Sequence, residues 1–357
     1  MRFVHIADMH FDSTFSELDA KSGLGEKRRL EQRNALKKVI NYIKENNIEY
    51  FFIAGDLFEY DTIRNSSIKF INECFKEIPE TKIFISPGNH DPFTKNSPYN
   101  TFEFNENVYI FKGNIEKIEC GEINVYGFGF TDFHEEESVI EKIYIDEPNK
   151  TNILVIHADV NGNKDEKGYM YNPISVTDLK AKKFDYVALG HVHKNNIKEN
   201  QNFIYPGSTI SFGFDELDEH GMVVGEIVDK KLKLDFVKID ERIFKEKELD
   251  ITKIQSKEEL VEKINEINIL EKEMIKLLLV GKRNIQINVK EIEKLIEQEN
   301  ILKIKDKTTI AIDTEKIEKE ASVKGFFIKE LKEKYKEYGL TEEELEQAIE
   351  IGLNAMN

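Results

Sequence analysis

The 357-residue sequence contains few cysteines and no hydrophobic run long enough to cross a membrane. Its two cysteines, Cys74 and Cys120, form no CxxC pair, which argues against a disulfide scaffold or a thiolate zinc site and fits a reducing cytoplasm. The apolar runs at Tyr50–Ala54 and Leu277–Val280 fall far short of the roughly 20 residues that span a bilayer. The N-terminal residues lack a basic n-region and a small-residue cleavage site, so we expect no signal peptide, no membrane association and a cytoplasmic location.

Basic residues are too few for a protein that binds nucleic acid over its whole surface. The chain carries 51 lysines and arginines against 68 aspartates and glutamates, a net charge of −17. A nucleic-acid-binding surface is normally basic, because it neutralises phosphates. Any such binding therefore depends on a local field in a cleft, or on a partner that supplies most of the contact.

Alternating strand and helix patterns in the N-terminal third predict an α/β fold with parallel strands. Apolar residues at helical spacing predict helices at 26–46 and 63–78. Short β-branched and aromatic runs predict strands at Phe3–Ala7, Tyr50–Ala54 and Lys82–Ser86. Strand patterns dominate the chain that follows, up to Ile239. This order predicts an αββα sandwich, in which two mixed sheets pack face to face and helices flank them.

A change in composition after Ile239 predicts further domains. Lysine, glutamate and isoleucine become dominant there, and no proline follows Pro206. We expect a first domain at residues 1–240, a small α+β domain with strand–helix–strand–helix–strand order at 241–315, and a helical segment at 316–357.

The C-terminal segment has the pattern of two helices separated at Gly339. Thr341 and Glu344 have the spacing of a capping box. Beyond them, Leu345, Ile349 and Leu353 form an apolar stripe, which suits either a helix-in-groove contact with a partner or packing against the chain's own core.

Five short motifs follow predicted strands, and five of the eight histidines lie in them. The carboxyl ends of strands in open α/β sheets form crevices, so side chains placed there can converge on one site. Of the remaining histidines, we expect His5 to pack in the core and His134 and His220 to be solvated. The motifs are Asp8-Met9-His10, Gly55-Asp56, Gly88-Asn89-His90-Asp91, His157 and Gly190-His191-Val192-His193.

The side chains in these motifs have the chemistry of a two-metal site. Two carboxylates, one amide and four imidazoles suit two divalent transition ions, and we expect Mn²⁺, with Fe²⁺ and Zn²⁺ as alternatives. Such ions clamp the attacking and leaving oxygens of a phosphoryl transfer, and metal-bound hydroxide attacks phosphorus. His90 is left over and can stabilise the phosphate or protonate the leaving oxygen. The expected ligands are Asp8, His10, Asp56, Asn89, His157, His191 and His193.

The motif set resembles the calcineurin-like metallophosphoesterase superfamily, whose fold is an αββα sandwich. Within it, the chain is similar to the SbcD/YhaO-type DNA repair exonucleases at the GDLF sequence of Gly55–Phe58, at Tyr205–Ser208 and at Phe212–Glu216. The resemblance is clear over residues 1–235, and Tyr171–Ile174 is similar to the YhaO branch.

The resemblance implies a role for each motif residue. Asp8, His10, Asp56 and His193 would hold one ion. Asp56, Asn89, His157 and His191 would hold the other, with Asp56 bridging the two. His90 would be the catalytic histidine. The position of residues 241–315 matches the family's capping domain.

One position departs from the family pattern. Some members have a second histidine directly after GDLF, implicated in handling the DNA end, and here Glu59 stands in its place. A carboxylate neither donates a proton at neutral pH nor attracts a phosphate, so the departure bears on end preference and on the balance between exonuclease and endonuclease cleavage.

The resemblance also implies partners. Nucleases of this type act on DNA with a coiled-coil ABC-type ATPase, here an SbcC/YhaN-like protein, and relatives often form homodimers. Lys194 directly follows the expected ligand His193 and is the best candidate for a DNA phosphate contact.

Three functions remain open from the sequence. The first is a manganese-dependent DNA exonuclease or endonuclease, the nuclease subunit of a double-strand-break repair complex. The second is a phosphoesterase that acts on nucleotides or nucleotide sugars, which the acidic charge and Glu59 favour. The third is a non-catalytic scaffold for the ATPase, against which the complete ligand set argues.

Overall fold

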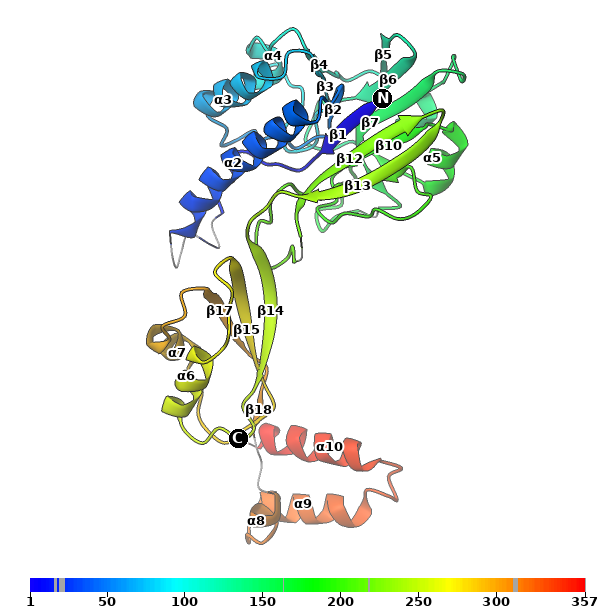
Figure 1. Cartoon of the computed structure of the whole chain (residues 1–357). Coiled ribbons are helices and arrows are strands. Elements are labelled where there is room, and N and C mark those ends of the chain that lie inside the picture. Colours follow the sequence, from blue (N-terminus) through cyan, green and yellow to red (C-terminus); the bar gives the residue numbers. More distant parts are fainter. Residues whose placement is uncertain (16–17, 19–22, 163, 218, 311–313, 357) are drawn as a thin grey trace. The chain divides into compact units, whose positions relative to one another are not determined.

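The computed structural model describes the chain except residues 16–17, 19–22, 163, 218, 311–313 and 357 (Figure 1). The chain divides into two compact units. The first contains Met1–Lys245 and Leu270–Met274, and the second contains Glu246–Ile269 and Ile275–Asn357. The three-domain division at residues 240 and 315 stays a prediction.

The first unit contains two β-sheets. The six-stranded sheet has the order β13-β12-β1-β2-β3-β4, with β1 to β4 parallel and β12 antiparallel to both β1 and β13. The five-stranded sheet has the order β11-β10-β7-β6-β5, in which only β5 is antiparallel. The strands of the first sheet are β1 (Arg2–Ile6), β2 (Tyr50–Ile53), β3 (Lys82–Ile85), β4 (Val108–Ile110), β12 (Gly221–Val228) and β13 (Lys231–Lys238). Those of the second are β5 (Glu116–Cys120), β6 (Ile123–Phe128), β7 (Thr151–His157), β10 (Tyr186–Gly190) and β11 (Phe203–Ile204).

Helices cover the outer faces of the two sheets. Helices α2 (Leu24–Glu45) and α3 (Asn65–Lys76) lie on one side of the unit, and α5 (Val176–Lys182) lies on the other (Figure 1). Shorter elements connect the strands; they are α4 (Pro98–Thr101), the 3-10 turn η1 (Ile140–Lys142), β8 (Asp159–Val160) and β9 (Pro173–Ile174). The predicted αββα sandwich is confirmed.

The alternation of side chains along each strand explains the layering. Phe52 points between the sheets and packs in one core cluster with Phe3, Val155 and Tyr186, which come from both sheets. Its neighbour Phe51 points the other way, and its ring meets Phe75 of α3 at a centroid distance of 6.3 Å. Strands buried on both faces are therefore apolar at every position.

The second unit contains a three-stranded sheet and two helices that pack on it. The sheet has the order β14-β15-β17, and its apolar face forms one cluster with the helices. The predicted strand–helix–strand–helix–strand order is confirmed, with an added pair of short strands. The elements are β14 (Ile243–Asp250), α6 (Lys257–Asn265), β15 (Glu273–Val280), β16 (Lys282–Arg283), α7 (Val289–Leu295), β17 (Ile301–Asp306) and β18 (Thr309–Ile310).

Three helices follow: α8 (Thr314–Glu318), α9 (Val323–Lys334) and α10 (Glu342–Ala355). The predicted capping box is confirmed, because the backbone N–H of Glu344 donates to Thr341 and that of Thr341 donates to the Glu344 carboxylate. The apolar stripe of α10 is buried: Ile349 and Leu353 pack against Ile328 of α9. Partner docking through this stripe is therefore wrong, because the chain itself covers it. No helix in the described part of the chain is long and apolar enough to cross a membrane.

Candidate metal centre

The five motifs lie at one edge of the sandwich. Strands β1, β2 and β3 of the first sheet and β7 and β10 of the second are parallel to their neighbours, and a motif ends or follows each of them. The carboxyl ends of these strands carry all of the expected ligands, which are Asp8, His10, Asp56, Asn89, His157, His191 and His193.

The loops that carry these side chains have unusual backbone conformations. Asp8, His10, Asp56 and His191 have φ angles of 50°, 45°, 52° and 106°, a region that residues with side chains rarely occupy. Backbone hydrogen bonds hold two of the loops together: the N–H of His10 donates to the carbonyl of Asp56 at 2.8 Å. Strain that the surrounding structure maintains is common at functional sites.

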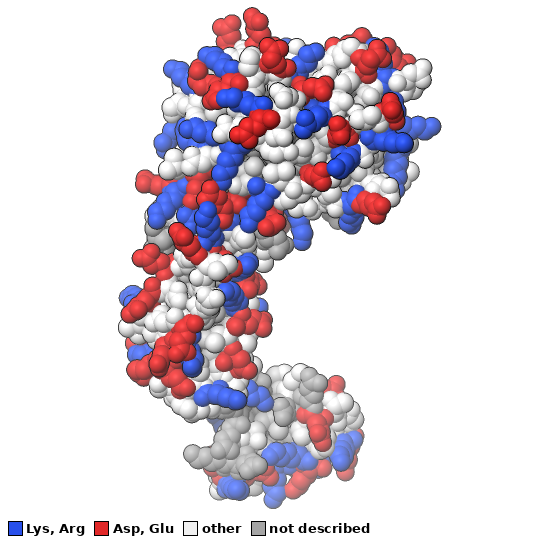
Figure 2. All heavy atoms as spheres, viewed as in Figure 1, with Lys and Arg blue, Asp and Glu red and all other residues white. Residues whose placement is uncertain are grey.

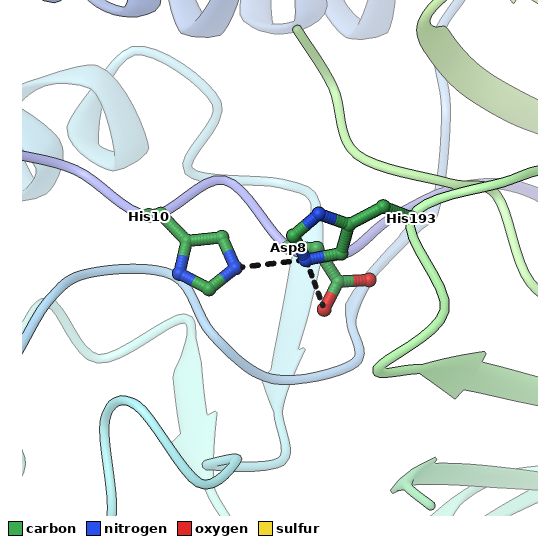
Figure 3. A group of neighbouring side chains, drawn as sticks. All are labelled: Asp8, His10 and His193. Carbon is green, nitrogen blue, oxygen red and sulfur yellow. Dashed lines mark hydrogen bonds and ion pairs between the residues drawn. The ribbon is translucent and has the colours of Figure 1, made fainter. Parts of the chain in front are cut away.

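The first group of candidate ligands is Asp8, His10 and His193 (Figure 3). The Nε2 atoms of the two histidines are 3.1 Å apart, and Nε2 of His193 is 3.9 Å from Oδ1 of Asp8. Each Nδ1 donates to a carboxylate, His10 to Glu59 at 2.7 Å and His193 to Glu216 at 2.5 Å. Both Nε2 atoms are thereby directed at one position.

That position requires a positive charge. Burial opposes charging of His193, but the hydrogen bond from Glu216 and the charge of Asp8 raise its pKa to about 9. A proton on Nε2 of His193 therefore lies between the two imidazoles. A divalent cation can replace that proton, because metal binding displaces protons from histidine ligands. The donor set fits a metal ion.

The second group contains Asp8, Asp56 and His157. Nδ1 of His157 donates to the carbonyl of Ala54 at 2.9 Å, so its Nε2 is an acceptor. That acceptor faces two oxygens, Oδ1 of Asn89 at 2.9 Å and Oδ2 of Asp56 at 3.4 Å. Burial lowers the pKa of His157, so the imidazole stays neutral. Three lone pairs that face one another without a proton also fit a metal ion.

His191 and the two aspartates complete this region. Nδ1 of His191 is 3.3 Å from Oδ1 of Asn89, and burial lowers the pKa of His191 to about 3. Burial raises the pKa of Asp8 to about 8. Burial acts on Asp56 in the same way, but His157, His10 and His90 outweigh it and hold the pKa of Asp56 below its usual value. Asp56 is therefore the buried anionic centre of the site.

Glu59 connects His90 to the ligand His10. Its two carboxylate oxygens accept from Nδ1 of His10 at 2.7 Å and from Nδ1 of His90 at 2.9 Å. Burial opposes ionisation of Glu59, but these hydrogen bonds lower its pKa to about 2. Burial also opposes charging of His90, but Glu59 and Asp56 raise the pKa of His90 to about 9. The carboxylate thus positions two imidazoles.

Two carboxylates that support the site were missed as functional residues by the sequence argument. Asp91 accepts hydrogen bonds from the backbone N–H groups of Asp56, Leu57 and Gly88 and from the hydroxyl of Tyr99, at 2.6–3.0 Å. It thereby fixes the turn that carries Asp56. Glu216 supports His193 from 23 residues along the chain. No local spacing signals such a contact, because the fold alone brings the two segments together.

The histidines outside the motifs follow the prediction only in part. His5 is buried in the core, as predicted. His220 was predicted to be solvated, and this prediction is wrong, because its side chain is only 4% exposed. Its Nδ1 lies 2.9 Å from the hydroxyl of Ser208. Charged neighbours in the sequence are exposed, but the residue before β12 points inward. His134 is half-buried and stacks on Tyr169. Lys194 is exposed directly after His193.

Gly190 permits the close approach of β10 and β2. A Cβ atom at this position would lie 1.7 Å from the carbonyl oxygen of Ala54, the group that orients His157. We expect Gly190→Ala to destabilise the fold by about 3 kcal/mol and to weaken Mn²⁺ binding. Gly121→Ala is the control, since that glycine has φ 67° and open space, and should cost about 1 kcal/mol. Chemical denaturation and calorimetric Mn²⁺ titration measure both effects, and equal behaviour of the two variants would contradict this packing argument.

The bridging role of Glu59 predicts a combined effect on metal binding and turnover. Glutamine can accept only one of the two imidazole N–H groups through its oxygen. We expect Glu59→Gln to weaken Mn²⁺ binding about 10- to 100-fold and to lower hydrolysis of a phosphodiester. Glu73→Gln, a surface carboxylate paired with Lys76 at 2.6 Å, should change neither. Unchanged metal affinity in Glu59→Gln would show that His10 needs no such support.

A two-sheet sandwich with carboxylates and imidazoles at one strand edge defines a metallophosphoesterase. Residues 1–195 match the calcineurin-like phosphoesterase family, and the chain belongs to this family.

Three curated relatives show the breadth of the similarity. The chain is 25% identical over 275 residues to the uncharacterized metallophosphoesterase YhaO of Bacillus subtilis, covering 72% of this chain and 64% of that protein. It is 23% identical to the SbcD component of the nuclease SbcCD from Staphylococcus epidermidis, covering 61% and 64%. It is 25% identical to the DNA double-strand break repair protein Mre11 of Methanocaldococcus jannaschii, covering 76% and 70%. The similarity thus spans just under two thirds of the first two proteins.

Proposed function

We propose that the chain is a two-metal phosphodiesterase that cleaves DNA, as the exonuclease and endonuclease subunit of a double-strand-break repair complex in the cytoplasm. The observation that carries this proposal is the convergence of Asp8, Asp56 and the motif histidines in a donor set that fits cations. The nuclease component and the repair protein among the relatives support DNA as the substrate.

The proposed assignment of ligands follows the motifs. The first ion would be held by Asp8, His10, Asp56 and His193. The second would be held by Asp56, Asn89, His157 and His191. A mixed nitrogen and oxygen set without a thiolate suits Mn²⁺, and also admits Fe²⁺ or Zn²⁺. Divalent ions held in this way act as Lewis acids on the phosphoryl group and on water.

His90 acts on the substrate in this proposal. Its side chain is 46% exposed, and Glu59 occupies Nδ1, so Nε2 is the atom that can reach a phosphate. Because the pKa of His90 is raised to about 9, the imidazole carries the proton that it can give to the leaving oxygen. Asp56 also positions His90, because its Oδ1 accepts from the backbone N–H of His90 at 2.8 Å.

The charge of the chain favours a second component for DNA binding. Figure 2 shows lysine and arginine side chains interspersed with aspartate and glutamate over the face in view. Two divalent ions and Lys194 would supply a local attraction for phosphate. The coiled-coil ABC-type ATPase would supply the remaining contact, and a homodimer would be formed through the nuclease unit.

A small-molecule phosphoesterase that acts on nucleotides is the alternative. The net charge of −17 and the carboxylate of Glu59 favour it, since both reduce the attraction for a long polyanion.

Lys194 separates the two functions experimentally. We expect Lys194→Ala to raise KM for linear DNA about threefold to tenfold in Mn²⁺ and to reduce the salt dependence of binding, because it removes one phosphate contact. Lys183→Ala, an exposed lysine at the end of α5, is the control and should leave KM unchanged. Efficient turnover of nucleotides or nucleotide sugars with intact DNA would support the alternative.

A further inference from the structure

Five aromatic side chains lie on three loops beside the candidate metal centre. They make contacts in pairs. The rings of His134 and Tyr169 stack at a centroid distance of 4.5 Å and an angle of 28°. The rings of Tyr60 and Phe133 meet edge-on at 5.4 Å. We call this group, together with Tyr171, the aromatic rim.

The rim touches the candidate metal centre at two points. The ring of Tyr171 lies 5.0 Å from that of His191, tilted by 32°. The backbone N–H of Tyr60 donates to the carbonyl of His90 at 2.9 Å. One contact is to a proposed metal ligand and the other is to the residue proposed to act on phosphate, so the rim borders the place where a scissile phosphate would bind.

The loops of the rim are ordered by their own hydrogen bonds. The backbone N–H of Asn172 donates to the carbonyl of Glu135 at 2.7 Å, which joins the loop of Phe133 to that of Tyr171. Asp165 accepts from the hydroxyl of Tyr171 and from the backbone N–H of Tyr169, each at 2.8 Å. The rings are thus held in place before any ligand arrives, which reduces the entropy cost of binding.

Burial does not account for two members of the rim. The side chains of Phe133 and Tyr169 are 45% and 42% exposed, although each already has an aromatic neighbour on one side. An ordered aromatic ring that keeps part of its surface in water beside a phosphate site can stack with the π-face of a base.

The charge around the rim specifies which part of a nucleotide it can accept. Asp132, Glu136 and Glu137 are exposed on the same loop as Phe133. These carboxylates repel phosphates, so a sugar–phosphate backbone would not follow this surface. A base is neutral, and carboxylates can accept hydrogen bonds from the amino groups of bases.

We propose that the aromatic rim binds an unpaired nucleobase adjacent to the scissile phosphate, with Phe133 and Tyr169 as its stacking surfaces. This inference rests on the proposed function, and deepens it by naming the substrate feature as a splayed or single-stranded base. The same chemistry is present in a DNA strand end and in a free nucleotide.

Fluorescence of 2-aminopurine tests the proposal without hydrolysis, because stacking quenches this base. One probe is a phosphorothioate-linked single strand with 2-aminopurine at its end, and the other is 2-aminopurine deoxynucleoside monophosphate, both titrated in Mn²⁺. We expect wild type to quench the probe, and Phe133→Ala with Tyr169→Ala to weaken binding about tenfold or more. Tyr169→Phe retains a ring and should restore quenching. Tyr144→Ala, at an 80% exposed tyrosine outside the rim, should match wild type.

The outcomes separate this inference from the proposed function. Quenching of the strand probe alone, lost in the double variant, supports a strand end at the rim, and quenching of both probes supports any nucleotide base. Hydrolysis of DNA with no rim-dependent quenching would overturn the inference and leave the proposed function standing. Rim-dependent quenching without DNA cleavage would support the rim and reject the nuclease.

Discussion

Replacing Asp56 with asparagine is expected to lower phosphodiester hydrolysis by at least about 1,000-fold and to abolish binding of two Mn²⁺ ions. Asp56 is the carboxylate shared by both proposed ion sites, and its side chain is buried. Asparagine retains an oxygen that can accept the backbone N–H of His90, now 2.8 Å from Oδ1. It removes the charge alone, so the loop should keep its conformation while the site loses its central anion.

Calorimetric Mn²⁺ titration and hydrolysis of bis(p-nitrophenyl) phosphate measure the two effects of Asp56→Asn. Thermal unfolding without metal should show that the variant is folded. Asp146→Asn is a matched control, since this surface carboxylate pairs with Lys117 at 2.8 Å, outside the motifs. Two Mn²⁺ ions bound at wild-type affinity in Asp56→Asn would reject the bridging role.

Replacing His90 with alanine is expected to lower DNA cleavage about 100- to 10,000-fold while metal affinity stays within about threefold of wild type. The imidazole is not among the proposed ligands, and Glu59 holds its Nδ1 at 2.9 Å. Loss of a proton donor should matter less when the leaving group is a good one. The effect on bis(p-nitrophenyl) phosphate should therefore be smaller than the effect on DNA.

The geometry also defines what would contradict this role. Ligand atoms of His10, Asp56 and His90 lie within 4.8 Å of one another, so His90 is close enough to join a metal site. A parallel loss of Mn²⁺ affinity in His90→Ala would identify it as a ligand instead. Equal losses on DNA and on bis(p-nitrophenyl) phosphate would indicate stabilisation of the phosphate and reject protonation of the leaving oxygen.

The parts of the site that follow a periodic pattern were predictable from the sequence. Apolar runs locate the strands, and parallel strands bring the residues that follow them to one edge. Hence Asp8, Asp56 and His157 could be expected together before the structure placed their ligand atoms within 4.8 Å of one another. The β6 strand, Ile123–Phe128, has the predicted bounds.

The supporting contacts were not predictable, because they depend on side-chain direction and on distant loops. Glu59 was interpreted as a residue that weakens DNA handling, yet its carboxylate holds both His10 and His90. His220 was expected in solvent, yet it contacts Ser208 in the interior. Neither composition nor spacing reports which way a loop side chain points.

The C-terminal helices illustrate a different limit. The stripe of α10 was correctly predicted as an apolar face, but its partner could not be identified from periodicity. The structure places Ile328 of α9 against Ile349 and Leu353. An amphipathic pattern indicates that a face is buried and leaves open what buries it.

Nucleotide release from linear duplex DNA is the most direct test of the central claim. The measurement compares wild type in Mn²⁺, wild type in EDTA, and His90→Ala in Mn²⁺. We expect release by wild type in Mn²⁺ alone, with His90→Ala reduced at least about 100-fold. Intact DNA under conditions in which bis(p-nitrophenyl) phosphate is hydrolysed would contradict the nuclease proposal and leave a metallophosphoesterase with another substrate.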